Sequence, residues 1–253
     1  METFAIANGL HPVKEDGSIN FDQKKTIEML ETYKALVGMS PEGIHHWQNG
    51  RDFYASDVVP LTFWASYLLD DIAGTRDNVP IMVDDNPQSL ALAQDTNVIV
   101  GMAGPSNPDG GTWVEVHNFG VTVDANTDEA AAFIEYVMNE EYVTWLGMAP
   151  EGSFPIRPGP SAGSNIFIDE WGNLPIGVDR KIPINQIYSG EIIESLINGL
   201  AVGTRWGAKE GQLPVAAKLV NSGLMNRLMM EYINGDRSAE ETVDMLNSEA
   251  AKL

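Results

Sequence analysis

Residues 110–141 read GGTWVEVHNFGVTVDANTDEAAAFIEYVMNEE, and within them the pattern changes from that of a strand to that of a helix. The apolar segment 114–123 follows a glycine turn and predicts a strand. Thr127 is the predicted N-cap of a helix whose first turn holds Asp128 and Glu129, where the helix dipole favours acidic groups. Apolar residues recur at helical spacing beyond this cap, which predicts one buried helix face. They are Ala130, Phe133, Ile134, Val137 and Met138.

The chain before this stretch contains one strong helix pattern and two strand patterns. Asp22 is suited to capping a helix that ends near Gly38, with Leu30 on its apolar face. Short runs rich in apolar and β-branched residues predict strands at 58–64 and 97–105. Helix and strand patterns therefore occur together from the first third of the chain onward.

The chain after this stretch is first irregular and then helical. Residues 159–188 are rich in glycine, proline and asparagine, which predicts a loop. The final helix should begin at Ser238, because Ser238 and Glu241 form an S-x-x-E capping box. The helices predicted in this part cover 191–202, 214–233 with a break near 221–223, and the residues from Ser238 onward.

Composition places the chain among globular proteins with a sizeable core. Its 253 residues are 43% hydrophobic, which is enough for one large or two modest domains. No run of 18 or more apolar residues occurs, so no membrane-spanning helix is predicted. The chain has no cysteine, which excludes disulfides, thiolate metal sites and a lipid-accepting cysteine within this sequence.

The charge of the chain is strongly acidic. Thirty-six acidic residues against fifteen basic ones give a formal net charge of −21, which repels phosphate backbones and argues against nucleic acid as a partner. The acids are dispersed in pairs such as Asp70-Asp71 and Glu140-Glu141 and do not form a tail. Dispersed acids with few lysines are typical of proteins adapted to high salt, and an ordinary acidic secreted protein is the alternative.

One short motif resembles that of a hydrolase. Residues 159–163 match G-x-S-x-G, the nucleophile elbow, around Ser161. That elbow requires a strand before the serine, whereas prolines precede it here. All four histidines (His11, His45, His46 and His117) also come before Ser161, although the α/β-hydrolase order places the histidine after it. We therefore interpret the match as chance.

No metal or cofactor site is predicted. His45 and His46 are adjacent and cannot both face one metal ion from a helix. The run 84–86 (Asp-Asp-Asn) lacks the spacing of a calcium loop, and the glycine-rich segment 104–111 lacks the lysine of a phosphate-binding loop. Two acids suited to glycoside cleavage could lie together in the fold, but the sequence does not single out such a pair.

The tryptophans are the more informative candidates for ligand binding. A flat indole ring can cover the apolar C–H face of a sugar while neighbouring polar groups bind its hydroxyls. Trp145 is expected to serve in packing. The other five tryptophans are predicted to lie beside loops or strand ends, and for them a packing role is the alternative to ligand binding. These are Trp47, Trp64, Trp113, Trp171 and Trp206.

In the order of its short sequence motifs, the chain resembles the extracellular solute-binding proteins of ABC importers, family 1. The resemblance is particularly to the carbohydrate binders of the maltodextrin-binding class. The family carries a g-x-x-V segment followed by n-eaA-fi-y on a helix, and these elements are matched by 119–123 and 126–136. The helix 28–36 resembles the family's eaLefYk-L, and 152–158 resembles its g-iPvr ending. Asp57 departs from the pattern, because the family often has a basic residue at this position.

The resemblance implies an α/β fold of the type II periplasmic-binding-protein class that holds mostly the second lobe. The N-terminal half of the first lobe has no counterpart, and neither does the family's usual signal or lipid anchor, so a processed or truncated chain is expected. The implied domain organisation has three segments. These are a second-lobe segment 1–116, a hinge-crossing strand and helix returning to the first lobe at 117–158, and second-lobe helices at 159–253.

The resemblance also implies a function and a set of site residues. The expected protein is not an enzyme but binds a carbohydrate outside the cell and delivers it to the ABC permease in the membrane. Trp64 matches an aromatic that stacks on sugar, while Trp113 and Glu115 would lie beside the cleft and Tyr188 near the ligand. The alternatives are a secreted glycoside hydrolase and a non-transport interaction domain. The ligand-binding residues expected from both arguments are Trp47, Trp64, Trp113, Glu115, Tyr188 and Trp206.

If part of the first lobe is missing, the helix 128–139 has lost the sheet on which it would pack. Its apolar face is then expected to be exposed or to be covered by dimerisation. A single lobe is also expected to bind sugar more weakly than two opposed lobes.

The net charge generates a prediction about salt. Because the excess negative charges repel one another, screening them should stabilise the folded state. We expect the melting temperature to rise through a potassium chloride series, as the Debye length falls from about 30 Å at 0.01 M to about 3 Å at 1 M. Calorimetric melting temperatures that stay constant or fall across this series would contradict the prediction.

Overall fold

The fold was analysed in a computed structural model, which describes residues 1–43, 46–76, 81, 86 and 89–253. It is a mixed α/β protein in which helices predominate and strands are short. The chain divides into two compact units. The first comprises residues 1–41, 99–116 and 198–253, and the second comprises residues 42–98 and 117–197.

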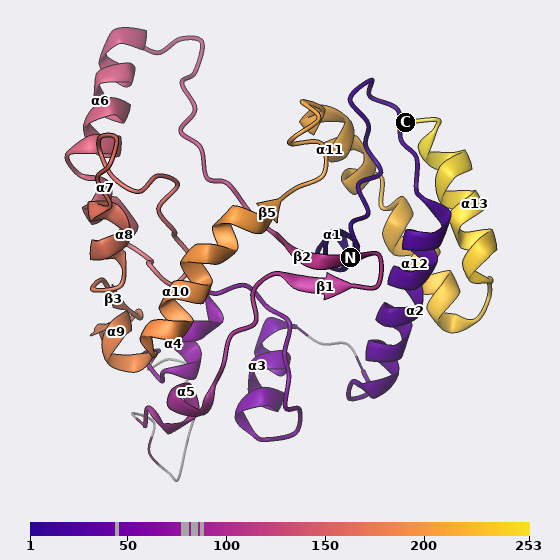
Figure 1. Ribbon diagram of the computed structural model, residues 1–253, viewed down its shortest axis with the longest axis horizontal. Coiled ribbons are helices and arrows are strands. Elements are labelled where there is room, and N and C mark those ends of the chain that lie inside the picture. The colour runs from indigo at the N-terminus through magenta and orange to yellow at the C-terminus, as the bar shows by residue number, and fades with distance from the viewer. Residues whose placement is uncertain (44–45, 77–80, 82–85, 87–88) are drawn as a thin grey trace. The chain divides into compact units, whose positions relative to one another are not determined.

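A small mixed sheet forms part of the first unit (Figure 1). Strands β1 (Met102–Gly104) and β2 (Asn107–Trp113) pair antiparallel, with Met102 opposite Gly111. Strand β5 (Gly203–Thr204) pairs parallel to the end of β2, with Trp113 opposite Thr204. Helix α1 (Glu2–Ala7) lies against β2, and Gly111 permits this approach, because a Cβ there would lie 3.1 Å from the Ile6 carbonyl oxygen.

Helices build the core of the first unit. Helix α2 (Gln23–Met39) begins at the predicted cap Asp22, whose carboxylate accepts a hydrogen bond from the Lys25 amide. Its buried side packs with α12 (Leu224–Asn234) and α13 (Ala239–Ala250). The predicted capping box of α13 is confirmed. The predicted break at 221–223 is also confirmed, because α11 (Leu213–Asn221) ends there and α12 starts after Gly223, whose φ is +68°.

The second unit consists mainly of short helices and contains the β3–β4 pair. Trp171 lies at the centre of its core, with 0% of its surface exposed, and its indole N–H donates to the carbonyls of Pro150 and Ser153. The elements of this unit are α3 (Trp47–Ala55), α4 (Leu68–Ile72), α5 (Ala91–Asp95), α6 (Thr127–Asn139), α7 (Tyr142–Leu146), α8 (Ile166–Trp171), β3 (Pro175–Ile176), β4 (Ile182–Pro183), α9 (Ile184–Ile187) and most of α10 (Gly190–Gly199).

Three predictions of local structure are wrong. Neither 114–123 nor 58–64 forms a strand; the strand near the first is β2, which ends at Trp113. Only the Val114 amide extends the pairing of β2, by donating to the Thr204 carbonyl, and farther along the run Val123 is 98% exposed. The supposed loop 159–188 contains α8, α9, β3 and β4.

Helix α6 forms where the sequence predicts it, but its apolar face is not buried. The N-cap is Asn126, one residue before the predicted Thr127, and its side chain accepts a hydrogen bond from the Glu129 amide. No residue of α6 is buried, and Phe133 is 59% exposed. The structure thus shows the exposed apolar surface that is expected if this helix lacks a packing partner.

The boundaries of the compact units differ from the segments drawn from the sequence. The chain passes between units after residues 41, 98, 116 and 197. Of the predicted segments 1–116, 117–158 and 159–253, only the boundary at 116/117 falls at one of these positions. The assignment of segments to the lobes of a binding protein stays a prediction.

The exposed face of α6 generates a prediction about local stability. Amide protons exchange through local opening, which is frequent where few apolar contacts oppose it. We expect the amides of α6 to exchange much faster than those of α12, where five of eleven side chains are buried. Hydrogen exchange followed by mass spectrometry measures both helices in one sample, and equal protection would contradict this expectation.

Candidate functional site

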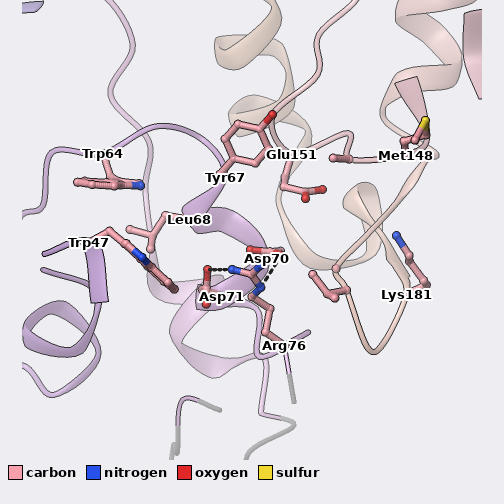
Figure 2. A pocket seen from close by; sticks show the side chains of 13 residues that line it. Trp47, Trp64, Tyr67, Leu68, Asp70, Asp71, Arg76, Met148, Glu151 and Lys181 are labelled. Carbon is pink, nitrogen blue, oxygen red and sulfur yellow. Dashed lines mark hydrogen bonds and ion pairs between the residues drawn. The ribbon is translucent and has the colours of Figure 1, made fainter. Parts of the chain in front are cut away.

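A pocket of about 600 Å³ in the second unit is the candidate functional site (Figure 2). Aromatic side chains line one side of it, and charged side chains line its base and its opposite side. The residues come from α3, from α4 and the chain on either side of it, and from the loops after α7 and β3. They are Trp47, Trp64, Tyr67, Leu68, Asp70, Asp71, Arg76, Met148, Ala149, Glu151, Gly177, Val178 and Lys181.

Helix α4 forms the base of the pocket because all five of its residues are buried. Leu68, Leu69 and Ile72 supply the apolar burial that fixes this short helix. Two side-chain hydroxyls hold its backbone through hydrogen bonds. The Tyr188 hydroxyl donates to the Leu69 carbonyl at 2.7 Å, and the Thr75 hydroxyl donates to the Asp70 carbonyl at 2.7 Å.

Burial of α4 places two adjacent carboxylates, Asp70 and Asp71, in the protein interior, where they are 2% and 3% exposed. Arg51 reaches Asp71 from α3, with Nη1 3.1 Å from Oδ1. Arg76 contacts both, with Nε 3.6 Å from Asp70 Oδ2 and Nη1 3.4 Å from Asp71 Oδ2. Buried charges require such partners, because an isolated ion loses its hydration without compensation.

These ion pairs do not supply a hydrogen-bond partner to every carboxyl oxygen of the pocket. Asp70 Oδ1 and Glu151 Oε2 are buried and have no hydrogen-bond partner within the described part of the chain. Burial, together with the neighbouring charges of Asp71 and Glu151, raises the pKa of Asp70 to about 7, although Arg76 acts in the opposite direction. Burial also raises the pKa of Glu151. Both carboxyls therefore hold a proton more readily than exposed acids do.

Two aromatic rings at the rim are open to a ligand. Trp64 is 59% exposed and Tyr67 is 42% exposed. The Tyr67 ring lies directly over Gly152, where a Cβ would be 2.0 Å from Cζ, so only glycine allows this position. Trp47 is half-buried and already contacts cations, with the guanidinium carbons of Arg51 and Arg76 at 5.6 and 5.9 Å from its ring centre.

The structure brings two of the six predicted ligand-binding residues together in this pocket, namely Trp47 and Trp64. Tyr188 belongs to the same unit but is 3% exposed, and its hydroxyl is used by the α4 backbone. Burial and the charge of Asp70 raise the pKa of Tyr188. These contacts favour the packing alternative for Tyr188.

The other three predicted residues belong to the first unit. Trp206 is 2% exposed, and its indole N–H donates to the Leu10 carbonyl at 2.8 Å. The Trp113 indole donates to Glu2, and the Arg205 guanidinium carbon lies 5.0 Å from its ring centre. Glu115 is exposed beyond the end of β2. Packing accounts for Trp206, and the hydrogen bond to Glu2 with the cation–π contact of Arg205 accounts for the position of Trp113. Their roles as ligand contacts stay predictions.

Sequence reasoning missed most of the polar residues of the site. Asp70 and Asp71 were recognised only as one of several dispersed acidic pairs, and Glu151, Arg76 and Lys181 were not singled out. A usable signal was present, because the two aspartates interrupt the apolar run LLDDIA at 68–73 and Arg76 follows shortly after. Charges inside an apolar run indicate a buried pair. The sequence could not have revealed Glu151, which is distant in the chain.

The described residues hold no group of three or more histidines or acids arranged to bind a metal ion. His45 and the run 84–85 lie outside the described residues. Among the helices described here, none has the length and apolar character needed to cross a membrane. In comparisons with known proteins, the chain matches no protein-family model and no curated protein sequence.

The shifted pKa of Asp70 generates a prediction about stability and pH. Between its ordinary value of 3.8 and about 7, the folded protein retains a proton that the unfolded chain has released. This group therefore lowers the free energy of unfolding as pH rises through that window. We expect Asp70→Asn to stabilise the protein at about pH 8, by at most about 4 kcal/mol at about 1.4 kcal/mol per pKa unit, and the gain to vanish near pH 4.

Urea unfolding across a pH series measures this difference. Glu194→Gln, which removes one exposed charge from α10 in the same part of the chain, is the control for the general reduction of negative charge. A difference between Asp70→Asn and the parent that does not vary with pH would show that Asp70 is ionised throughout.

Proposed function

We propose that the protein binds a carbohydrate in the pocket of the second unit, as the solute-binding component of an ABC importer. The observation that carries this proposal is the combination of exposed aromatic rings and buried charged groups around one hollow of about 600 Å³. A volume of this size fits a small ligand, and pockets with apolar walls and a few polar groups are typical of ligand sites.

The two sides of the pocket match the two kinds of surface on a sugar. The exposed rings of Trp64 and Tyr67 provide flat apolar faces for the ring C–H groups. Arg76, Glu151 and Lys181 provide donors and acceptors at the base and the opposite side. Trp64 is also the residue for which the resemblance to carbohydrate binders supplies a specific stacking role, so two independent arguments converge on it.

The same resemblance supports the rest of the proposal. It suggests a type II periplasmic-binding-protein fold, a location outside the cell and delivery of the sugar to the permease subunits. In such a protein, binding shifts a population between open and closed states, and no bond of the ligand is broken. The mixed α/β architecture is compatible with this fold class.

A glycoside hydrolase is the second candidate, and the buried acids favour it. Asp70, with a pKa of about 7, is suited to donating a proton, and Asp71 is held beside it by Arg51. Two carboxyls in unlike environments are the general requirement for glycoside cleavage. Release of reducing ends from an oligosaccharide by the protein would identify the hydrolase, whereas binding without turnover would identify the transport component.

The role of Trp64 is tested by substitution. We expect Trp64→Ala to weaken sugar affinity by about 1.5–3 kcal/mol, because an aromatic anchor that becomes buried by the ligand carries energy of this order. A thermal-shift screen of mono- and oligosaccharides identifies the ligand, and titration calorimetry measures both proteins. Trp145→Ala removes a 37% exposed tryptophan outside the pocket and is the matched control. An unchanged dissociation constant for folded Trp64→Ala would contradict the assignment.

A further inference from the structure

The pocket contains carboxylate oxygens that need hydrogen-bond donors. Asp70 and Glu151 are each more than nine-tenths buried, and one oxygen of each has no partner among the described residues. An unsatisfied buried acceptor destabilises the protein, and more so when it is charged. Figure 2 shows the Glu151 carboxyl directed into the space between Tyr67, Asp70 and Lys181. A ligand group that donates hydrogen bonds here would recover this cost.

The charge of the wall determines which donor fits best. The described lining residues include three acids, Asp70, Asp71 and Glu151, and two bases, Arg76 and Lys181. The arginines are directed at the aspartates, Arg51 at Asp71 and Arg76 at both, and neither arginine forms an ion pair with Glu151 among those described. Burial, followed by the charges of Asp71 and Glu151, raises the pKa of Asp70. A protonated amine is favoured over a neutral donor at the unpaired oxygens of Asp70 and Glu151, because hydrogen bonds from an ionised donor are the stronger ones.

The aromatic rim favours the same kind of ligand. A cation is attracted to the face of an indole or phenol ring. The face of Trp47 is occupied by the guanidinium groups of Arg51 and Arg76, whereas the rings of Trp64 and Tyr67 are substantially exposed. A ligand lying between this rim and Glu151 can place a flat ring on the aromatics and an ammonium group toward the carboxyls.

We propose that the pocket selects an amino sugar, with the protonated amine of the ligand directed at Asp70 and Glu151 and the sugar ring stacked on Trp64 and Tyr67. This inference rests on the proposed carbohydrate-binding function and narrows it to a chemical class. The amine supplies up to three donors, which is enough for both unsatisfied oxygens. Acetylation would remove the charge and add bulk, so the acetylated sugar should lose this preference.

Titration calorimetry on this chain tests the proposal with glucosamine, glucose, N-acetylglucosamine and glucuronate, in low salt and below the pKa of the amine. We expect glucosamine to bind at least about tenfold more tightly than glucose, which corresponds to about 1.4 kcal/mol. Glu151→Gln should reduce this ratio to near one, whatever its effect on the affinity for glucose itself. Glu135→Gln, which removes an exposed charge from α6, should leave the ratio unchanged.

The remaining outcomes separate this inference from the function on which it rests. Equal binding of glucose and glucosamine, or tighter binding of glucuronate, would reject the amino-sugar inference and retain carbohydrate binding. Binding of butylamine as tight as that of glucosamine would retain a cation site and reject the carbohydrate function. Binding of none of these compounds, or of their oligosaccharides, would reject both. Circular dichroism of each variant establishes that a lost response is not a lost fold.

Discussion

The buried charge cluster of α4 is the constraint on which the second unit depends. Two neighbouring aspartates can be removed from water in a helix only if cations accompany them or a proton neutralises them. Arg51 arrives from α3 and Arg76 from the segment after α4, so the cluster fixes three pieces of chain against one another. The hydroxyls of Tyr188 and Thr75 hold the α4 backbone in place. Removing one arginine alone should therefore cost more than the pair contributes, because it strands a buried charge.

This cluster also explains why the pocket is polarised. The carboxyls are placed by the burial of α4, and the arginines that balance them approach from the side where Trp47 lies. Glu151 then adds a third carboxyl, whose pKa is raised by burial although Lys181 and Arg76 act in the opposite direction. A site that is incompletely neutralised in the absence of ligand can gain more from a bound cation than a balanced one. The same feature is a stability cost, which is a familiar property of functional sites.

The surface of the second unit has a different character from its core. Helix α6 exposes Phe133 on a segment that carries acids and no base, since no lysine or arginine occurs between Arg76 and Arg157. Phe119, Phe133 and Trp145 contact one another and cover part of this face. The first unit instead buries its large apolar side chains in one core around Trp206. The two units thus rest on different balances of apolar burial and charge.

The sequence by itself determined most of the helices, because caps and apolar periodicity are local. Asp22, Ser238 with Glu241, and the break before Gly223 are examples. It also determined the net charge, and it identified Trp47 and Trp64 as candidate ligand-binding residues. It did not determine the strands, since the runs 58–64 and 114–123 have β-forming residues but are not strands, and strand pairing depends on residues distant in the chain, as between Trp113 and Thr204. Only the tertiary structure decided which charges meet: Glu151 is separated from Asp70 by eighty positions in sequence, and no local pattern encodes a contact across that distance.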